Sequence, residues 1–280
     1  MRVIKHNTAC RQDRASGDGP LTQTPIKFVD VHCHCLPNLD DGPESMEEAI
    51  ALCRVLAADH VSTVVATPHQ LGRFEDRTKA EAIRRTVGAL NRALVERGID
   101  LAVLPGAEVR VDERIDQLLA RGEILTLADT GRHLLLELPW DAWIDIEPLL
   151  VQFAFRGVHT LLAHPERNGP LLERPQMLRR WALSGVSLQV TAGSLTGDWG
   201  RYVERAAWGL VVQGGRACIA TDAHDGAQPP GMTKAFEAVA ARLGPDLAYL
   251  LCVENPARVI RGEKLAPVSG GIDGSFGDRA

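Results

Sequence analysis

Histidine and carboxylate residues recur at short spacings in a pattern suited to metal chemistry. The run V-H-C-H places His32 and His34 two residues apart, and the run D-A-H gives Asp222 and His224 the same spacing. Residues two apart on a strand point to the same side, so each pair presents two ligand groups together. Imidazole and carboxylate ligands without thiolate are typical of manganese, iron or zinc in catalytic sites.

Further candidate ligands follow or end other short apolar runs. They are Asp40 and Asp41 in LDDG, His69 in ATPH, Glu108 in PGAE, Glu137 in LLLELP and His164 in LLAH. Together with the two pairs they exceed what one tetrahedral ion uses, so we expect two or three metals that share bridging carboxylates. Such a cluster lowers the pKa of a bound water towards ~7 and polarises a phosphoryl or carbonyl oxygen. This chemistry hydrolyses a substrate without a protein nucleophile.

Two arginines lie near these candidates. Arg167 follows His164 in HPER, and Arg73 follows His69 in HQLGRFE. A guanidinium fork binds oxyanions, so Arg167 is expected to hold an anion over the metals. The alternative is that Arg167 forms a surface salt bridge. Arg73 is the second candidate for binding the anion.

A cysteine and an arginine also have the spacing of cysteine-dependent tyrosine phosphatases, C-x5-R, at Cys252–Arg258. The intervening VENPA lacks the glycines that would turn backbone N–H groups towards a phosphate. We therefore predict that Cys252 is not a nucleophile.

Short apolar runs alternate with segments of helical period along most of the chain. Strands are expected at 28–32, 61–66, 101–104, 133–138, 159–163, 186–190 and 217–220, and helices at 44–59, 76–97, 112–121, 145–156, 171–184, 201–213 and 232–243. The seven β-then-α units predict an α/β fold with a parallel sheet covered on both faces, either a closed or nearly closed barrel or a doubly wound open sheet. The candidate ligands follow strand ends, where such barrels carry their chemistry. Cys33 and Cys35 alternate with the histidines and are expected to face the covering helices.

The composition is that of a globular protein and excludes some classes of partner. The chain has 280 residues, of which 45% are hydrophobic and 24% charged, with a net charge of −5. We expect no nucleic-acid partner and no membrane insertion. Six cysteines without a CxxC pair, and no apolar leader, favour a reducing cytoplasm. Residues 1–25 and 266–280 are expected to be a disordered extension and tail around one domain at 26–265.

The order and spacing of these motifs resemble a known family. The segments VDVHCHCLPNLDDGPESMEEAI, VVATPHQLGRFE, VLPGAEVRV, LLLELPW, LLAHPERN, ATDAHDGAQPPGM and ENPARVI, from Phe28 to Arg261, are similar to the PHP-domain tyrosine-protein phosphatases of bacterial capsule and exopolysaccharide loci. The resemblance implies a distorted (β/α)7 barrel, or PHP fold, with three metal ions, usually Mn²⁺, with Fe or Zn as alternatives. It also implies a phosphorylated tyrosine autokinase with a tyrosine-rich tail as substrate and partner.

The same resemblance assigns the site residues. The metal ligands would be His32, His34, Asp41, His69, Glu108, Glu137, His164, Asp222 and His224. Asp41 and Arg167 would be catalytic, and Arg167 would bind the phosphate, with Arg73 as a further contact. The family usually has an arginine shortly after D-x-H, where this chain has Ala227 and Gln228. The alternatives are a phosphoesterase for a small metabolite such as histidinol phosphate or a nucleotide, and a weakly active regulatory binding module.

Overall fold

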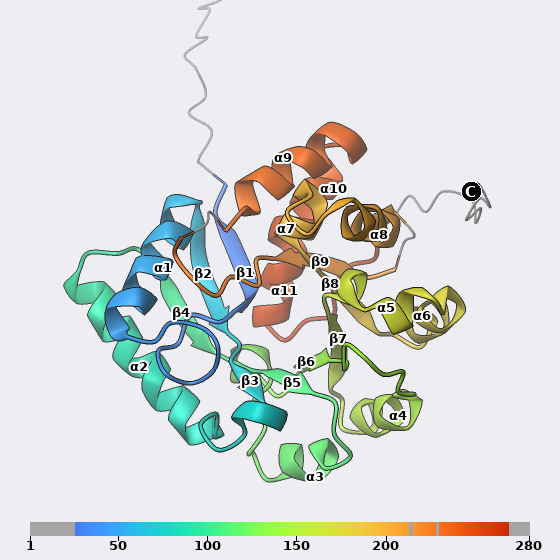
Figure 1. Cartoon of the computed structure of the whole chain (residues 1–280), viewed down its shortest axis with the longest axis horizontal. Coiled ribbons are helices and arrows are strands. Elements are labelled where there is room, and N and C mark those ends of the chain that lie inside the picture. The colour runs from blue at the N-terminus through green and yellow to red at the C-terminus, as the bar shows by residue number, and fades with distance from the viewer. Residues whose placement is uncertain (1–25, 213–214, 228–229, 269–280) are drawn as a thin grey trace, which may run out of the picture.

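Strands and helices alternate through nearly the whole of the described chain. The computed structural model describes residues 26–212, 215–227 and 230–268 (Figure 1). The strands are β1 (Phe28–Cys33), β2 (Val61–Ala66), β3 (His69–Gln70), β4 (Ala102–Pro105), β5 (Glu108–Arg110), β6 (His133–Glu137), β7 (His159–Ala163), β8 (Ser187–Thr191) and β9 (Ala217–Ala220). The α-helices are α1 (Met46–Ala58), α2 (Ala80–Glu96), α3 (Ile115–Ala120), α4 (Glu147–Phe155), α5 (Gly169–Leu172), α6 (Pro175–Leu183), α7 (Ala192–Thr196), α8 (Arg201–Val212), α9 (Met232–Leu243), α10 (Pro245–Tyr249) and α11 (Asn255–Ile260).

The strands pair in parallel, which confirms the predicted α/β class. They form a sheet in the order β1-β2-β4 and a second sheet in the order β3-β5-β6-β7-β8-β9. The end of β1 also meets the segment after β9, because Asp222 donates its backbone N–H to the His32 carbonyl at 2.8 Å and His34 donates to the Ala223 carbonyl at 2.9 Å. The carboxyl ends of the first and last strands therefore lie side by side.

After two of the predicted strands, β2 and β4, the chain bends into a short strand of the other sheet that the sequence did not predict. Pro68 lies between β2 and β3 and has no N–H to donate to a neighbouring strand. Gly106 lies between β4 and β5, where an added Cβ would lie 2.6 Å from Val65 Cγ1. The bends allow β3 to pair with β5, which places His69 opposite Glu108.

The helices follow the predicted segments with shorter ends. Ser45 accepts the Glu48 backbone N–H at 3.2 Å and so caps the start of α1. The segment expected as one helix at 171–184 is two, because Pro175 begins α6 and cannot continue α5. Residue 213, at the end of a predicted helix, lies outside the described residues. The sequence did not predict α7 or the run of α10, a π-helical turn at Leu250–Glu254 and α11.

The cysteines of the described residues lie in the core. Cys33 and Cys35 have no exposed surface, and Cys35 shares a hydrogen bond with Cys53 of α1, so their predicted place under a covering helix is confirmed. Cys252 is also fully buried, and burial raises the pKa of its thiol. A buried, protonated thiol is a poor nucleophile, in agreement with the prediction from the sequence.

The predicted terminal segments are mostly outside the described residues, which exclude 1–25 and 269–280. Residues 266–268 are described and contact the rest of the protein. Ala266 donates its N–H to Asn255 Oδ1 at 2.8 Å, and Val268 donates to the Gly215 carbonyl at 2.7 Å. Within the described ranges, no helix combines the length and hydropathy needed to cross a bilayer.

Candidate metal centre

The ligand residues expected from the sequence converge where the carboxyl ends of the strands meet. They form four overlapping groups, and within each group the candidate ligand atoms lie within 4.8 Å of one another. The groups are His34, Asp41, His69 and His224; His32, His164 and Asp222; His32, His34 and Glu108; and His69, Glu108 and Glu137. These groups contain all nine ligands that the family resemblance implies, but not Asp40.

Glu108 lies at the centre of the arrangement and is fully buried. Its Oε2 atom is 3.3 Å from His32 Nε2, 3.4 Å from His34 Nε2 and 3.1 Å from His69 Nδ1. Among the described residues this oxygen has no hydrogen-bond partner. A buried carboxylate oxygen facing three imidazoles needs a further partner, and a metal ion fits that requirement.

Asp222 provides a second central carboxylate. Its Oδ1 atom lies 3.2 Å from His32 Nε2 and 3.4 Å from His34 Nε2. Asp222 has a φ of 55° and His164 a φ of 30°, both in the left-handed region that residues other than glycine seldom adopt. Backbone strain of this kind persists only where surrounding contacts enforce it, and it clusters at functional sites.

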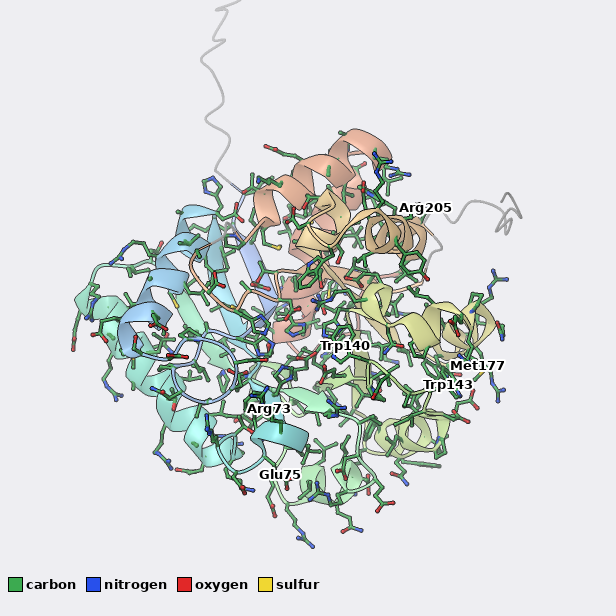
Figure 2. All side chains as sticks on the ribbon, viewed as in Figure 1. Arg73, Glu75, Trp140, Trp143, Met177 and Arg205 are labelled. Atoms are coloured by element: carbon green, nitrogen blue, oxygen red, sulfur yellow. The ribbon has the colours of Figure 1, made fainter. Side chains whose placement is uncertain are left out.

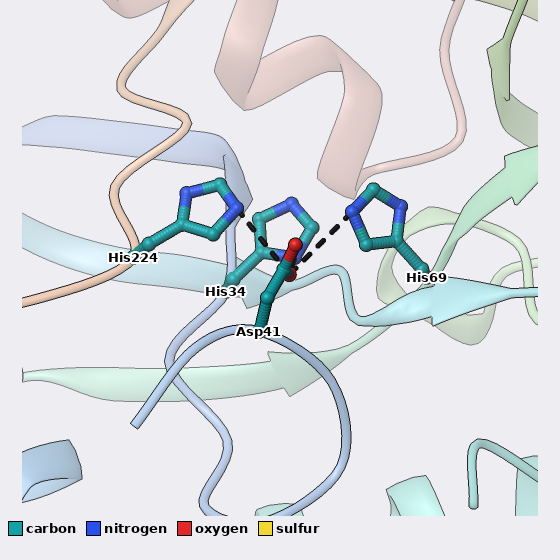
Figure 3. Close-up of side chains that lie close together, drawn as sticks. All are labelled: His34, Asp41, His69 and His224. Carbon is teal, nitrogen blue, oxygen red and sulfur yellow. Dashed lines mark ion pairs between the residues drawn. The ribbon is translucent and has the colours of Figure 1, made fainter. Parts of the chain in front are cut away.

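Asp41 lies at the outer edge of the cluster. Figure 3 shows its carboxylate between the rings of His69 and His224, with Oδ1 3.6 Å from the Nε2 atom of each. The His224 ring stacks on His34 with centroids 4.0 Å apart. The Asp41 side chain is 46% exposed, whereas those of Glu108 and Asp222 are 0% and 4% exposed. Asp41 is therefore the candidate ligand most open to an incoming molecule.

Two further side chains orient the central imidazoles. Asp40 Oδ2 accepts a hydrogen bond from His34 Nδ1 at 2.6 Å, and Gln189 Oε1 accepts one from His32 Nδ1 at 2.9 Å. With Nδ1 donating, each Nε2 faces the cluster as a possible ligand atom. Asp40, a candidate ligand in the sequence, is therefore a positioning residue. Gln189 was not predicted, although a glutamine inside the apolar strand SLQVT is a usable signal.

Burial and close charges set the ionisation of the cluster. Burial opposes the charged form of Glu108, but His32 and His164 hold the pKa of this carboxyl well below its ordinary value. Burial also opposes a charged His34, yet Asp40 and its other carboxylate neighbours hold the pKa of this imidazole well above its ordinary value. Burial and the charge of Glu108 raise the pKa of Glu137 to about 7. Metal ligation requires deprotonated ligands, so a metal would displace protons here.

Arg167 lies beside the central ligands, between two tryptophans. Its side chain is 8% exposed and donates a hydrogen bond to Asp222 Oδ2. The guanidinium carbon is 4.6 Å from the ring centroid of Trp199 and 5.6 Å from that of Trp140, both of which are partly exposed. Trp140 also stacks on His164 at 5.3 Å. The scattered aromatic residues gave no sign of this arrangement in the sequence.

Arg73 lies at the edge of a cavity of about 240 Å³ beside the cluster. The lining includes Asp41, His69, Arg73, Arg110, Glu137 and Trp140, and Figure 2 shows Arg73 and Trp140 near the centre of the molecule. Arg110 was not predicted, although it follows Glu108 by two residues on β5 and so points to the same side.

The family usually has an arginine shortly after D-x-H, where this chain has Ala227 and Gln228. Ala227 is exposed, and Gln228 lies outside the described residues.

Comparison with known proteins identifies the family of this chain. Residues 28–261 match the family described as "Capsular polysaccharide synthesis, CpsB/CapC". Tyrosine-protein phosphatase YwqE of Bacillus subtilis is 32% identical over 240 residues, which cover 85% of this chain and 93% of YwqE. Tyrosine-protein phosphatase CpsB of Streptococcus pneumoniae is 28% identical over 83% of this chain and 98% of CpsB.

A solved structure gives the same relationship. Crystallographic work describes YwqE from Bacillus subtilis and CpsB from Streptococcus pneumoniae as unique metal-dependent tyrosine phosphatases. The matched chain has a TM-score of 0.82 and 30% identity, over 89% of this chain and 100% of the other. Family match, sequence identity and fold agree, and the chain belongs to the CpsB/CapC family of capsular polysaccharide synthesis proteins.

Proposed function

We propose that this protein is a metal-dependent phosphatase that hydrolyses phosphotyrosine in proteins. One observation carries the proposal: the four ligand groups converge beside the buried Arg167. Two exposed tryptophans, Trp140 and Trp199, flank this arginine. The relatives named as tyrosine-protein phosphatases, which match most of this chain, support the same activity.

Three metal ions fit the number and overlap of the ligand groups, and manganese is the metal we propose. His32, His34, Asp41, His69, Glu108, Glu137, His164, Asp222 and His224 would hold them, and the carboxylate of Glu108 belongs to two of the ligand groups. When bound, the metals would supply Lewis-acid polarisation of a phosphoryl oxygen and an activated water. Nitrogen and oxygen ligands without a thiolate suit this assignment.

Arg167 and Asp41 are proposed to act on the substrate itself. The Arg167 guanidinium would bind outer phosphate oxygens, since it lies at the cluster and is held in place by Asp222 and the tryptophan rings. Asp41 lies at the exposed edge of the cluster, where the ester oxygen of a bound substrate would be close to its carboxylate. Arg73, on the wall of the adjoining cavity, would contact residues around the phosphotyrosine.

The tryptophans favour an aromatic substrate over an aliphatic one. Trp140 is 46% exposed and Trp199 is 54% exposed, which is unusual for residues of this size beside a buried charge. A phenyl ring that stacks on them would gain the contacts they lack on their open faces. The partner we propose is the tyrosine-rich tail of an autophosphorylating kinase. We place the protein in the cytoplasm, because the five free, buried cysteines of the described residues fit a reducing compartment.

A comparison of substrates tests this proposal. Metal-loaded protein should hydrolyse a phosphotyrosine peptide with a kcat/KM at least tenfold higher than that for histidinol phosphate, and metal-free protein should hydrolyse neither. Trp140→Ala should raise KM for the peptide more than KM for an alkyl phosphate. Preference for histidinol phosphate would favour a small-metabolite phosphoesterase. Tight peptide binding without turnover would favour a regulatory binding module.

A further inference from the structure

A second cavity opens at the amino ends of the strands, away from the candidate metal centre. It has a volume of about 280 Å³, and its lining includes His133, His159, Arg216 and Lys264. His133 and His159 are the first residues of β6 and β7, whereas Glu137, a candidate ligand, is the last residue of β6. At a rise of about 3.3 Å per residue, the two ends of β6 are roughly 13 Å apart.

The charged residues that line this cavity are all basic. Arg216 and Lys264 form no ion pair within the part of the chain that the structure describes, and neither does nearby Arg132. Glu263, next to Lys264 in sequence, pairs instead with Arg261 at 2.9 Å and with Arg258 at 3.8 Å. The basic groups of the cavity therefore keep a positive potential that no described carboxylate on its wall offsets.

His133 adds a buried polar group without a partner. It has no exposed surface, and neither of its ring nitrogens has a hydrogen-bond partner among the described residues. Its ring lies beside that of His159, with centroids 5.4 Å apart. Burial, His159 and Arg132 lower the pKa of His133 to about 4, so the ring is neutral at pH 7. Buried polar groups are rarely left unpaired in folded proteins, and an acceptor bound in the cavity would satisfy this one.

Aliphatic side chains form another part of the wall. Leu150 and Ala154 of α4 and Val158 face the same space. Figure 1 shows α4 and α6 on the same side of the molecule, and the Arg180–Glu147 ion pair at 2.7 Å joins them. A cavity with basic groups at one part of its wall and aliphatic side chains at another suits an anion that carries a small organic group.

From these contacts we propose that the cavity binds a small organic phosphate. The phosphate would face His133, His159, Arg216 and Lys264, and the organic part would pack against Leu150, Ala154 and Val158. A guanidinium and an ammonium together match a phosphate dianion. This site is separate from the phosphate that the metal centre would bind, so one chain would hold two phosphates.

Equilibrium dialysis of the metal-loaded protein with labelled inorganic phosphate counts these sites. The unaltered protein should bind two phosphates per chain. The Arg216→Gln/Lys264→Gln variant should bind one, with the other weakened at least tenfold, and should keep its kcat/KM and its unfolding temperature. The matched control is Arg92→Gln/Lys234→Gln, which removes two exposed charges elsewhere and should keep both sites. The proposal is overturned if the cavity variant binds as many phosphates as the unaltered protein. A single site in the unaltered protein that the cavity variant loses would instead contradict phosphate binding at the metal centre, which belongs to the proposed function.

Two phosphonates test the organic part of the ligand without being hydrolysed. Butylphosphonate should compete for the cavity site at least tenfold and up to about 60-fold more strongly than methylphosphonate, because three more methylene groups would be buried. This difference should disappear in the Arg216→Gln/Lys264→Gln variant. Equal competition by both compounds would contradict an organic phosphate as the ligand.

Discussion

Arg167 is the side chain on which phosphate binding should depend most. Asp222 and the rings of Trp140 and Trp199 hold its guanidinium beside the candidate metal centre. Arg167→Ala should lower kcat/KM for a phosphotyrosine peptide on the order of 100-fold, roughly 3 kcal/mol, as expected for losing a charge-assisted contact to a developing anion. Steady-state kinetics with metal content measured in parallel checks this result.

Arg73→Ala is the matched comparison, since Arg73 lies on the wall of the adjoining cavity and is exposed. It should cost less than Arg167→Ala with a protein substrate. A loss below threefold in Arg167→Ala together with a severe loss in Arg73→Ala would mean that the phosphate binds at the other loop.

Asp40 should control metal affinity without being a ligand. It holds the His34 ring through Nδ1 and also accepts the backbone N–H groups of His69 and Gly42, each at 3.1 Å. Asp40→Ala should weaken metal binding about 10–100-fold, as is typical when the partner of a ligating histidine is lost. Asp40→Asn keeps an acceptor oxygen and should recover part of the affinity, as measured by competition with a chelator. Equal affinity in Asp40→Ala and the unaltered protein would contradict this role.

At the scale of elements, the bend at Gly106 requires a residue without a side chain. Gly106→Ala would place a Cβ 2.6 Å from Val65 Cγ1, so β4 and β2 would have to separate. The substitution should lower the free energy of unfolding by about 1–3 kcal/mol. Val65→Ala in the same chain should relieve part of this cost, so the double variant should lose less than the sum of the single ones. Denaturant unfolding measures these differences.

The control for this prediction is Gly169→Ala at the start of α5, where nothing lies within 4 Å of the added Cβ. It should change the free energy of unfolding little. A cost at Gly169 as large as that at Gly106 would point to the loss of glycine itself rather than to the contact with Val65.

The sequence predicted the long strands and helices better than it predicted the short strands and the last helices of the chain. Each of the seven apolar runs is a strand, because strands buried on both faces are apolar throughout. The two-residue strand β3 and the three-residue strand β5 are too short for periodicity to identify. The helices from α10 to α11 escaped prediction because LAYLLCVENPARVI has no clear polar face and contains a proline. The order of the motifs indicated the candidate ligands. Gln189, Trp140 and Trp199 were not among the predicted site residues, and only the fold brings them to the candidate metal centre.

For the whole molecule, metal removal should lower stability. Without metals, the carboxylates of Glu108 and Glu137 remain side by side, and burial together with the charge of Glu108 raises the pKa of Glu137. Ligands that bind only the folded state stabilise it by about 4 kcal/mol at a thousandfold excess over Kd, so chelation should lower the unfolding temperature on the order of 10 °C. Added Mn²⁺ should restore it in calorimetry. An unchanged unfolding temperature after verified metal removal would count against a cluster of this size.

Metal affinity should also depend on pH. The pKa of His34 lies well above its ordinary value in the metal-free protein, so this imidazole holds a proton at neutral pH and must release it to become a ligand. Affinity should therefore fall as the pH is lowered from 8 to 6, by up to about tenfold per pH unit for each proton released. Chelator competition at several pH values measures this slope, and a slope of zero would contradict proton displacement.

The position of Trp140 has an optical consequence. Its indole stacks on His164 at 5.3 Å and lies beside Arg167, so an emitting group is in direct contact with the proposed metal ligands. A paramagnetic ion such as Mn²⁺ bound by His164 should quench the indole emission, and a diamagnetic ion such as Zn²⁺ should quench it far less. The protein would thus report its own metal loading through intrinsic fluorescence, without an attached dye, and Trp140→Phe would remove the signal.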